Sequence, residues 1–158
     1  MLDVILALKF VHMIAMAVMF GAWTCIALFM LLAYRSGKAP LAALTTRFVV
    51  RAELTLMIPV IALQPLVGYP LAVAIGDRLD EYWLEASVAI YAAGVAAWLA
   101  NLIIALRLRK VTHAAALSGK ALPEPSRRLF FVWSAISLAG LAGMVAIMAL
   151  MVWQPHWY

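Results

Sequence analysis

Apolar residues fill four long stretches of this chain, and short runs containing glycine, proline and charged residues separate them. The stretches cover approximately residues 4–34, 54–75, 83–108 and 129–153. At about 1.5 Å per residue, a helix through any of them is at least ~30 Å long, which is enough to cross the hydrocarbon core of a bilayer. The pattern therefore predicts an all-α polytopic membrane protein, a four-helix up-down bundle, with residues 1–158 forming a single integral-membrane domain.

The runs between these stretches define the connections. Gly37 and Pro40 interrupt the helical pattern after the first stretch. Residues 41–52 then carry Arg47 and Arg51 among apolar residues, and we predict an interfacial helix there. Residues 76–82 form a short acidic loop that joins the second and third spans.

The second span is rich in proline, with three residues of this type at Pro59, Pro65 and Pro70. Each proline lacks a backbone N–H and pushes aside the carbonyl four residues earlier, which leaves free acceptors near Thr55, Ile61 and Leu66. We expect a kinked helix. Either the kink lines a cavity around Gln64 and Gly68, or it is an ordinary feature of a membrane helix. Gln64 itself is expected to form an interhelical hydrogen bond.

Composition and charge support the membrane interpretation. Hydrophobic residues make up 68% of the chain and charged residues 12%, and the mean hydropathy is +1.03. Ten of the twelve cations lie in the segments joining spans one to two and three to four, namely Arg35, Lys38, Arg47, Arg51, Arg107, Arg109, Lys110, Lys120, Arg127 and Arg128. The positive-inside rule then places both termini outside and the two cation-rich segments in the cytoplasm. Because the cations flank spans, the net charge of +5 does not indicate a nucleic-acid partner.

Three weaker patterns concern packing. Ser36-Gly37-Lys38-Ala39-Pro40 recurs 82 residues later as Ser118-Gly119-Lys120-Ala121-Leu122-Pro123, which either helix-pair duplication or similar loop chemistry would produce. Small residues at positions 89, 93, 97 and at 135, 139, 143 predict close helix approach. Aromatic residues are expected at the outer interface (Tyr69, Tyr82, Trp83, Trp153, Trp157, Tyr158) and at the inner one (Tyr34, Trp133).

Ionisable residues inside the first span are the main functional clue. Lys9 and His12 lie three residues apart on one helix face, at a depth where charge is costly. By the helix rise, the candidate site residues share a layer ~8 to 16 Å from the outer ends of the spans. Histidine alone, or histidine with methionine, is a haem ligation pattern, and bundle cores hold such sites. We therefore predict a haem b site with His12 as the metal ligand, surrounded by Lys9, Gln64, Tyr91, Met144 and Met148.

Plainer interpretations of these residues stay open. His12 can serve only to hydrogen-bond another helix, and Lys9 can extend to the outer headgroups. A zinc site is disfavoured because zinc takes three or four protein ligands. Glu53 lies near the inner interface, and we expect it to pair with Arg107 or Arg128.

Several motifs together resemble a bacterial four-span membrane family, domain of unknown function 2269. They are Lys9-Phe10-Val11-His12, Phe20-Gly21, Gln64-Pro65-Leu66-Val67-Gly68, Trp83-Leu84 and the segment from Arg127 to Trp133. The resemblance covers nearly the whole chain. It extends more distantly to CopD-type copper-resistance proteins and HemJ-type protoporphyrinogen oxidases, which share the Lys-x-x-His helix and are associated with haem. It implies His12 as an axial ligand with Lys9 as its companion, while Ser87 replaces a lysine of the oxidases and argues against protoporphyrinogen oxidation.

The expected function is therefore haem b binding for electron transfer or haem handling. If the protein is an enzyme, we expect a membrane haem-dependent oxidoreductase. Two other classes stay open: a metal or small-solute transport component, and a structural subunit of a membrane complex without a cofactor. The partners compatible with these readings are the lipid bilayer, a redox partner or quinone, and a second copy in a homo-oligomer.

Overall fold

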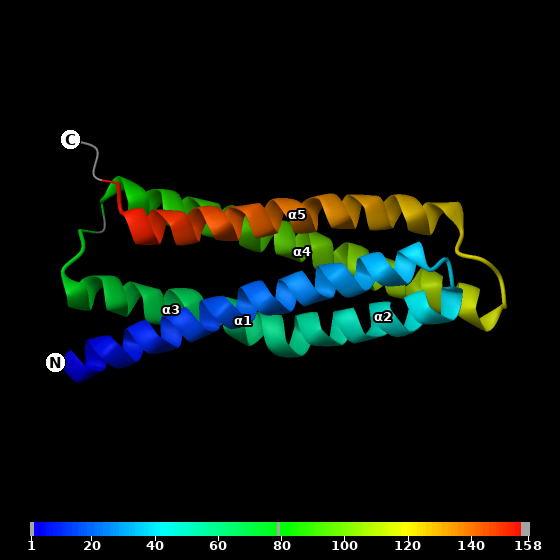
Figure 1. Cartoon of the computed structure of the whole chain (residues 1–158), viewed down its shortest axis with the longest axis horizontal. Coiled ribbons are helices and arrows are strands. Elements are labelled where there is room, and N and C mark those ends of the chain that lie inside the picture. The colour runs from blue at the N-terminus through cyan, green and yellow to red at the C-terminus, as the bar shows by residue number, and fades with distance from the viewer. Residues whose placement is uncertain (1, 79, 156–158) are drawn as a thin grey trace.

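The computed structural model of the chain describes residues 2–78 and 80–155, and within them it is helical apart from short loops (Figure 1). The elements are α1 (Leu2–Arg35), α2 (Ala39–Ala52), the π-helix η1 (Glu53–Met57), α3 (Ile58–Ile75), α4 (Tyr82–Leu117) and α5 (Glu124–Trp153). They form four helices long and apolar enough to cross a membrane. The predicted all-α bundle of four spans is confirmed.

A helix forms where residues 41–52 predicted one. This helix, α2, continues without a break through η1 into α3, so that Ala39–Ile75 is one helical stretch. Arg47 and Arg51 lie on the exposed face of α2, whereas Thr46 and Val49 are buried against the rest of the bundle. The position of α2 at the membrane interface stays a prediction.

The π-helix lies where the proline pattern predicted irregular backbone. Pro59 falls in the first turn of α3, directly after η1. The N–H of Ile58 donates to the carbonyl of Glu53, five residues earlier, instead of four. Because Pro59 has no N–H to continue the α-helical ladder, the wider turn before it absorbs the missing bond. Glu53 and Met57, at the two ends of this turn, are both buried.

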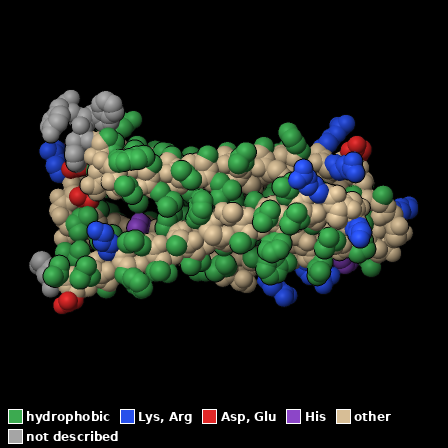
Figure 2. Space-filling view, in the orientation of Figure 1, with side chains coloured by type: hydrophobic (Ala, Val, Ile, Leu, Met, Phe, Trp, Pro, Cys, Tyr) green, Lys and Arg blue, Asp and Glu red, His purple; other side chains and the backbone are tan. Residues whose placement is uncertain are grey.

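The helices pack as two pairs that meet along part of their length. α1 packs mainly on α3 and α4 on α5, while α2 joins the pairs by packing on α4 and α1. At the end of the bundle that carries the loops after α1 and α4, the core contains Met30, Val49, Val50, Leu108 and Trp133. At the opposite end the pairs separate, and Figure 2 shows the surface hollowed between them.

Charged side chains divide between the two ends of the bundle. Most lysine and arginine side chains visible in Figure 2 gather at the end that carries the loops after α1 and α4. The loop between α3 and α4 lies at the other end (Figure 1), where Arg78 donates to both carboxylate oxygens of Asp80 at 3.1 and 2.8 Å. These hydrogen bonds and the guanidinium charge lower the pKa of the exposed Asp80 carboxyl.

The aromatic residues predicted at the two membrane interfaces differ in how deeply they are buried in the bundle. Tyr34 and Trp133 are buried, and the Tyr34 ring stacks on Phe130 with centroids 4.1 Å apart. Trp83 is also buried and donates to a Glu81 carboxylate oxygen at 2.6 Å. Tyr69, Tyr82 and Trp153 are exposed, and the position of all these residues at the interfaces stays a prediction. Trp157 and Tyr158 lie outside the described residues.

The two Ser-Gly-Lys loops share two local features, a serine hydroxyl bond and a left-handed glycine. Ser36 and Ser118 each donate from the hydroxyl to the carbonyl three residues earlier, at 2.7 and 3.1 Å. Gly37 and Gly119 adopt left-handed backbone conformations with φ of 69° and 65°. Such a conformation ends a helix at little cost only in glycine. The sequence echo therefore corresponds to two equivalent helix ends.

We predict that Gly140→Ala destabilises the bundle, because Trp23 of α1 packs directly on that glycine. A Cβ atom at position 140 would lie 2.8 Å from Cζ2 of the indole. Overpacking of this kind costs roughly 1–3 kcal/mol, and thermal unfolding in detergent would measure it. Gly21→Ala is the matched control, since no neighbouring atom lies within 4 Å of its Cβ position. Equal midpoints for the two variants would contradict the predicted close contact.

Candidate functional site

His12 packs against a glycine at the hollowed end of the bundle. It lies on α1 and is half-buried, and its imidazole faces Gly68 of α3. A Cβ atom at position 68 would lie 3.0 Å from Cε1 of the ring and 3.4 Å from Nδ1. Glycine weakens a helix interior by about 1 kcal/mol relative to alanine, and here its missing side chain makes room for the imidazole.

Two polar side chains in this corner have buried atoms without partners. Nδ1 of His12 and Nε2 of Gln64 lack a hydrogen-bond partner in the part of the chain that the structure describes. Gln64 is only 6% exposed and lies one helical turn from Gly68, and its backbone carbonyl is a hydrogen-bond acceptor for the His12 ring. Gln64 therefore links α3 to α1 through its backbone, while its amide nitrogen forms no hydrogen bond within the described chain. A buried polar atom without a partner costs about 1–3 kcal/mol, so this pair indicates a place for a further group.

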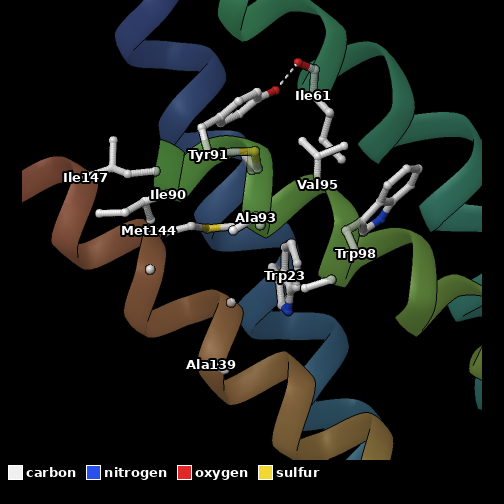
Figure 3. Close-up of a pocket in the computed structure, with 15 residues that line it drawn as sticks. Trp23, Ile61, Ile90, Tyr91, Ala93, Val95, Trp98, Ala139, Met144 and Ile147 are labelled. Atoms are coloured by element: carbon white, nitrogen blue, oxygen red, sulfur yellow. Dashed lines mark hydrogen bonds between the residues drawn. The ribbon is translucent and has the colours of Figure 1, made fainter. Parts of the chain in front are cut away.

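Tyr91 occupies one of the carbonyls that the prolines release. Its hydroxyl donates to the backbone oxygen of Ile61 at 2.5 Å, as the dashed line in Figure 3 shows. Ile61 lies four residues before Pro65, so its carbonyl has no helical donor. The prediction of a free acceptor at Ile61 is confirmed, and Tyr91 is its partner from α4.

The remaining predicted site residues do not converge on His12. Met144 is buried with Met19 and Trp23 in the middle of the bundle. Met148 is 44% exposed, so the structure does not bring it to the interior. Lys9 is exposed, one turn from His12 towards the start of α1. His12 and Gln64 thus form the core of the candidate site, with Lys9 at its rim.

An apolar cavity of about 230 Å³ lies deeper in the bundle, between α1, α3, α4 and α5. Figure 3 shows Trp23, Tyr91 and Met144 around it. Its walls include the small residues that were expected to pack closely, namely Ala93, Ala97, Ala139 and Gly143. Ala93 and Ala139 are exposed, so the cavity opens to the outside of the bundle near them. The cavity lacks polar anchors from His12 or Gln64, neither of which lines it.

Glu53 is a further candidate functional residue, and its carboxylate has a different partner from the one predicted. It is 6% exposed, and one carboxylate oxygen accepts from the Trp98 indole N–H at 2.5 Å. No lysine, arginine or histidine of the described chain lies within salt-bridge distance of it, so the expected pairing with Arg107 or Arg128 is wrong. In the sequence, Glu53 is a single acidic residue at the start of a proline-rich apolar stretch. That pattern does not predict which side chain will contact the carboxylate.

Among residues 2–78 and 80–155, no three histidine, cysteine, aspartate or glutamate side chains gather in one place. The donors at the candidate site are therefore one imidazole and one amide, with an ammonium group at the rim. Such a set can bind a group that takes a single strong ligand from the protein. It can also hydrogen-bond a polar ligand.

We predict that Tyr91→Phe lowers the stability of the protein, because the Ile61 carbonyl then loses its donor in apolar surroundings. The expected loss in the free energy of unfolding is roughly 0.6 to 2 kcal/mol. The lower figure is typical of a hydrogen bond between membrane helices, and the higher one of a buried polar group left without a partner. Thermal unfolding in detergent measures it. Tyr69→Phe is the control, since Tyr69 is 62% exposed. A midpoint for Tyr91→Phe equal to that of the parent would show that the carbonyl has another donor.

The comparisons agree with the helical architecture. No curated protein and no solved structure matches the chain. The model of one family, described as a predicted integral membrane protein (DUF2269), matches residues 6–155, which is nearly the whole chain. With its four membrane-length apolar helices, the chain belongs to the DUF2269 family of predicted integral membrane proteins.

Proposed function

We propose that this integral membrane protein binds haem b through His12 and serves in electron transfer or haem handling. The observation that supports the proposal is the His12 ring held against Gly68, with a buried nitrogen that has no partner in the described chain. An ionisable side chain inside a membrane span is costly and generally marks a functional position. A neutral imidazole is also the commonest protein ligand for transition metals.

The donor chemistry of this corner fits haem. His12 would hold the iron through its imidazole, and the Gln64 amide would be available to hydrogen-bond the bound group. Lys9 would meet a propionate, because it is exposed one turn away from His12. Met148 has no role in this proposal, since its side chain is exposed. When bound, haem supplies a redox-active iron, and a membrane quinone or a protein would be its electron partner.

The orientation follows from charge. We infer that both termini lie in the periplasm of a bacterial inner membrane, because the cation-rich loops after α1 and α4 share one end of the bundle. This orientation places His12 in the periplasmic half of the membrane.

We predict that His12→Ala abolishes the Soret absorption of protein purified from cells supplied with haem. Lys9→Ala should only weaken or shift it, because the iron bond remains. Gly68→Ala should also reduce haem content, since the new methyl group displaces the imidazole. Gly94→Ala, where no atom lies within 4 Å of the added Cβ, is the control and should keep the spectrum.

The proposal has two clear failure outcomes. A colourless parent protein from haem-supplied cells would reject haem binding. A normal spectrum in a folded His12→Ala variant would reject His12 as the ligand. Thermal unfolding of each variant separates loss of haem from loss of the fold.

A second candidate function, transport, is favoured by Glu53. This carboxyl is buried without a cation near it, and it begins a π-helix, a feature often found at functional sites. Carboxyl groups at membrane depth commonly mark proton or ion paths. Trp98 would hold the group in place through its indole N–H.

For this candidate we predict that the parent protein, reconstituted in liposomes loaded with a pH-sensitive dye, dissipates an imposed proton gradient. Glu53→Gln should stop the flux but keep the fold, because an amide oxygen still accepts from Trp98 while the exchangeable carboxyl proton is lost. Glu85→Gln is the control, since Glu85 is exposed. No flux above that of empty liposomes would reject this candidate. If haem binding fails as well, a structural subunit remains.

A further inference from the structure

We propose that the groove between the two Ser-Gly-Lys loops binds the headgroup of an anionic phospholipid, such as phosphatidylglycerol. The groove has a volume of about 720 Å³. The loop after α1 and the loop after α4 both line it, and each contributes one lysine, Lys38 and Lys120. Two cations from segments that are 82 residues apart thus face one groove.

Neither lysine is neutralised within the described chain. Lys38 and Lys120 are exposed, and neither has a carboxylate within salt-bridge distance among residues 2–78 and 80–155. Glu124 is the acidic residue closest to either loop in sequence, and it does not line the groove. The groove therefore carries an uncompensated positive charge, which complements a phosphate group.

The loop backbones hold the lysines at defined positions. The N–H of Lys38 donates to the Ser36 hydroxyl at 3.2 Å, and the N–H of Lys120 donates to the Ala115 carbonyl at 3.2 Å. The left-handed glycine before each lysine ends the preceding helix in the same way. The two side chains thus begin from fixed points on either side of the groove, which reduces the entropy lost when they hold a ligand.

The walls of the groove favour a lipid over a soluble anion. Leu41 and Leu44 of α2 line it and are 42% and 63% exposed, and Ala115 and Ala116 of α4 line the opposite side. From this groove α2 continues through η1 into the apolar helix α3, in one uninterrupted helical stretch. A phospholipid can place its phosphate between the lysines and its acyl chains along this surface, whereas inorganic phosphate uses only the charges.

The test is binding of phosphatidylglycerol and phosphatidylcholine to the detergent-purified full chain, followed by native mass spectrometry and by thermal stabilisation. We expect the parent to bind phosphatidylglycerol more tightly than phosphatidylcholine. Lys38→Gln combined with Lys120→Gln should weaken phosphatidylglycerol binding about twenty-five-fold, the product of two roughly fivefold contributions. Arg127→Gln combined with Arg128→Gln removes the same charge at the same end from exposed residues outside the groove, and should retain binding.

Four outcomes would overturn the proposal. Equal affinity of the parent for the two lipids would exclude headgroup recognition. Equal losses in the two double variants would show a general effect of charge. Equally effective competition by inorganic phosphate would indicate a site for a soluble anion. Unchanged binding by a folded lysine double variant would place the lipid elsewhere, and the thermal midpoint without lipid confirms folding. None of these results depends on haem.

Discussion

The constraint that governs this structure is that a backbone carbonyl inside a bilayer needs a donor from the protein. Lipid offers none, so a helix that loses a backbone bond must replace it internally. The second span loses such bonds at three prolines. It meets the loss with a π-turn before Pro59 and with the Tyr91 hydroxyl on the Ile61 carbonyl. The irregular segment is thereby fixed to α4, and the same span carries Gln64 and Gly68, which face His12 of α1.

This constraint also explains why the His12 corner is notable. The Ile61 carbonyl, which lacks a helical donor, accepts a hydrogen bond from Tyr91. One turn further along α3, the buried Gln64 amide nitrogen and Nδ1 of His12 have no partners in the described chain. The His12 ring lies next to Gly68, the one residue type that admits the imidazole there. Tyr34, Asn101 and Trp133 also carry buried polar atoms without partners in the described chain. The feature that supports our proposal of a ligand is therefore the imidazole held against a glycine inside a helix.

The sequence predicted the helices well because length and hydropathy determine whether a segment spans a bilayer. It predicted the released Ile61 carbonyl because proline chemistry is local. It failed where the answer depended on which face of a helix turns inward. Met148, Tyr34 and Trp133 lie in helices that are apolar nearly all round. The hydrophobic pattern therefore does not predict which face of each helix is buried. The sequence also could not predict the hydrogen-bond partner of Glu53, because the wider π-turn and the position of Trp98 depend on how the helices pack.

The polar groups inside the bundle form two separate sets, and this separation bears on the choice between ligand binding and passage. His12 and Gln64 lie towards one end, whereas Glu53 with Trp98 and Asn101 with Ser137 lie in the other half. A cluster of Met19, Met57 and Met144 with Trp23 and Trp98 lies at the level between them. The cavity of about 230 Å³ lies in this thioether and indole layer, and no carboxylate, imidazole or ammonium group lines it. A proton crossing the layer would therefore lack such carriers there, whereas a ligand held at His12 needs none. The packing thus supports binding at one end more strongly than passage through the bundle.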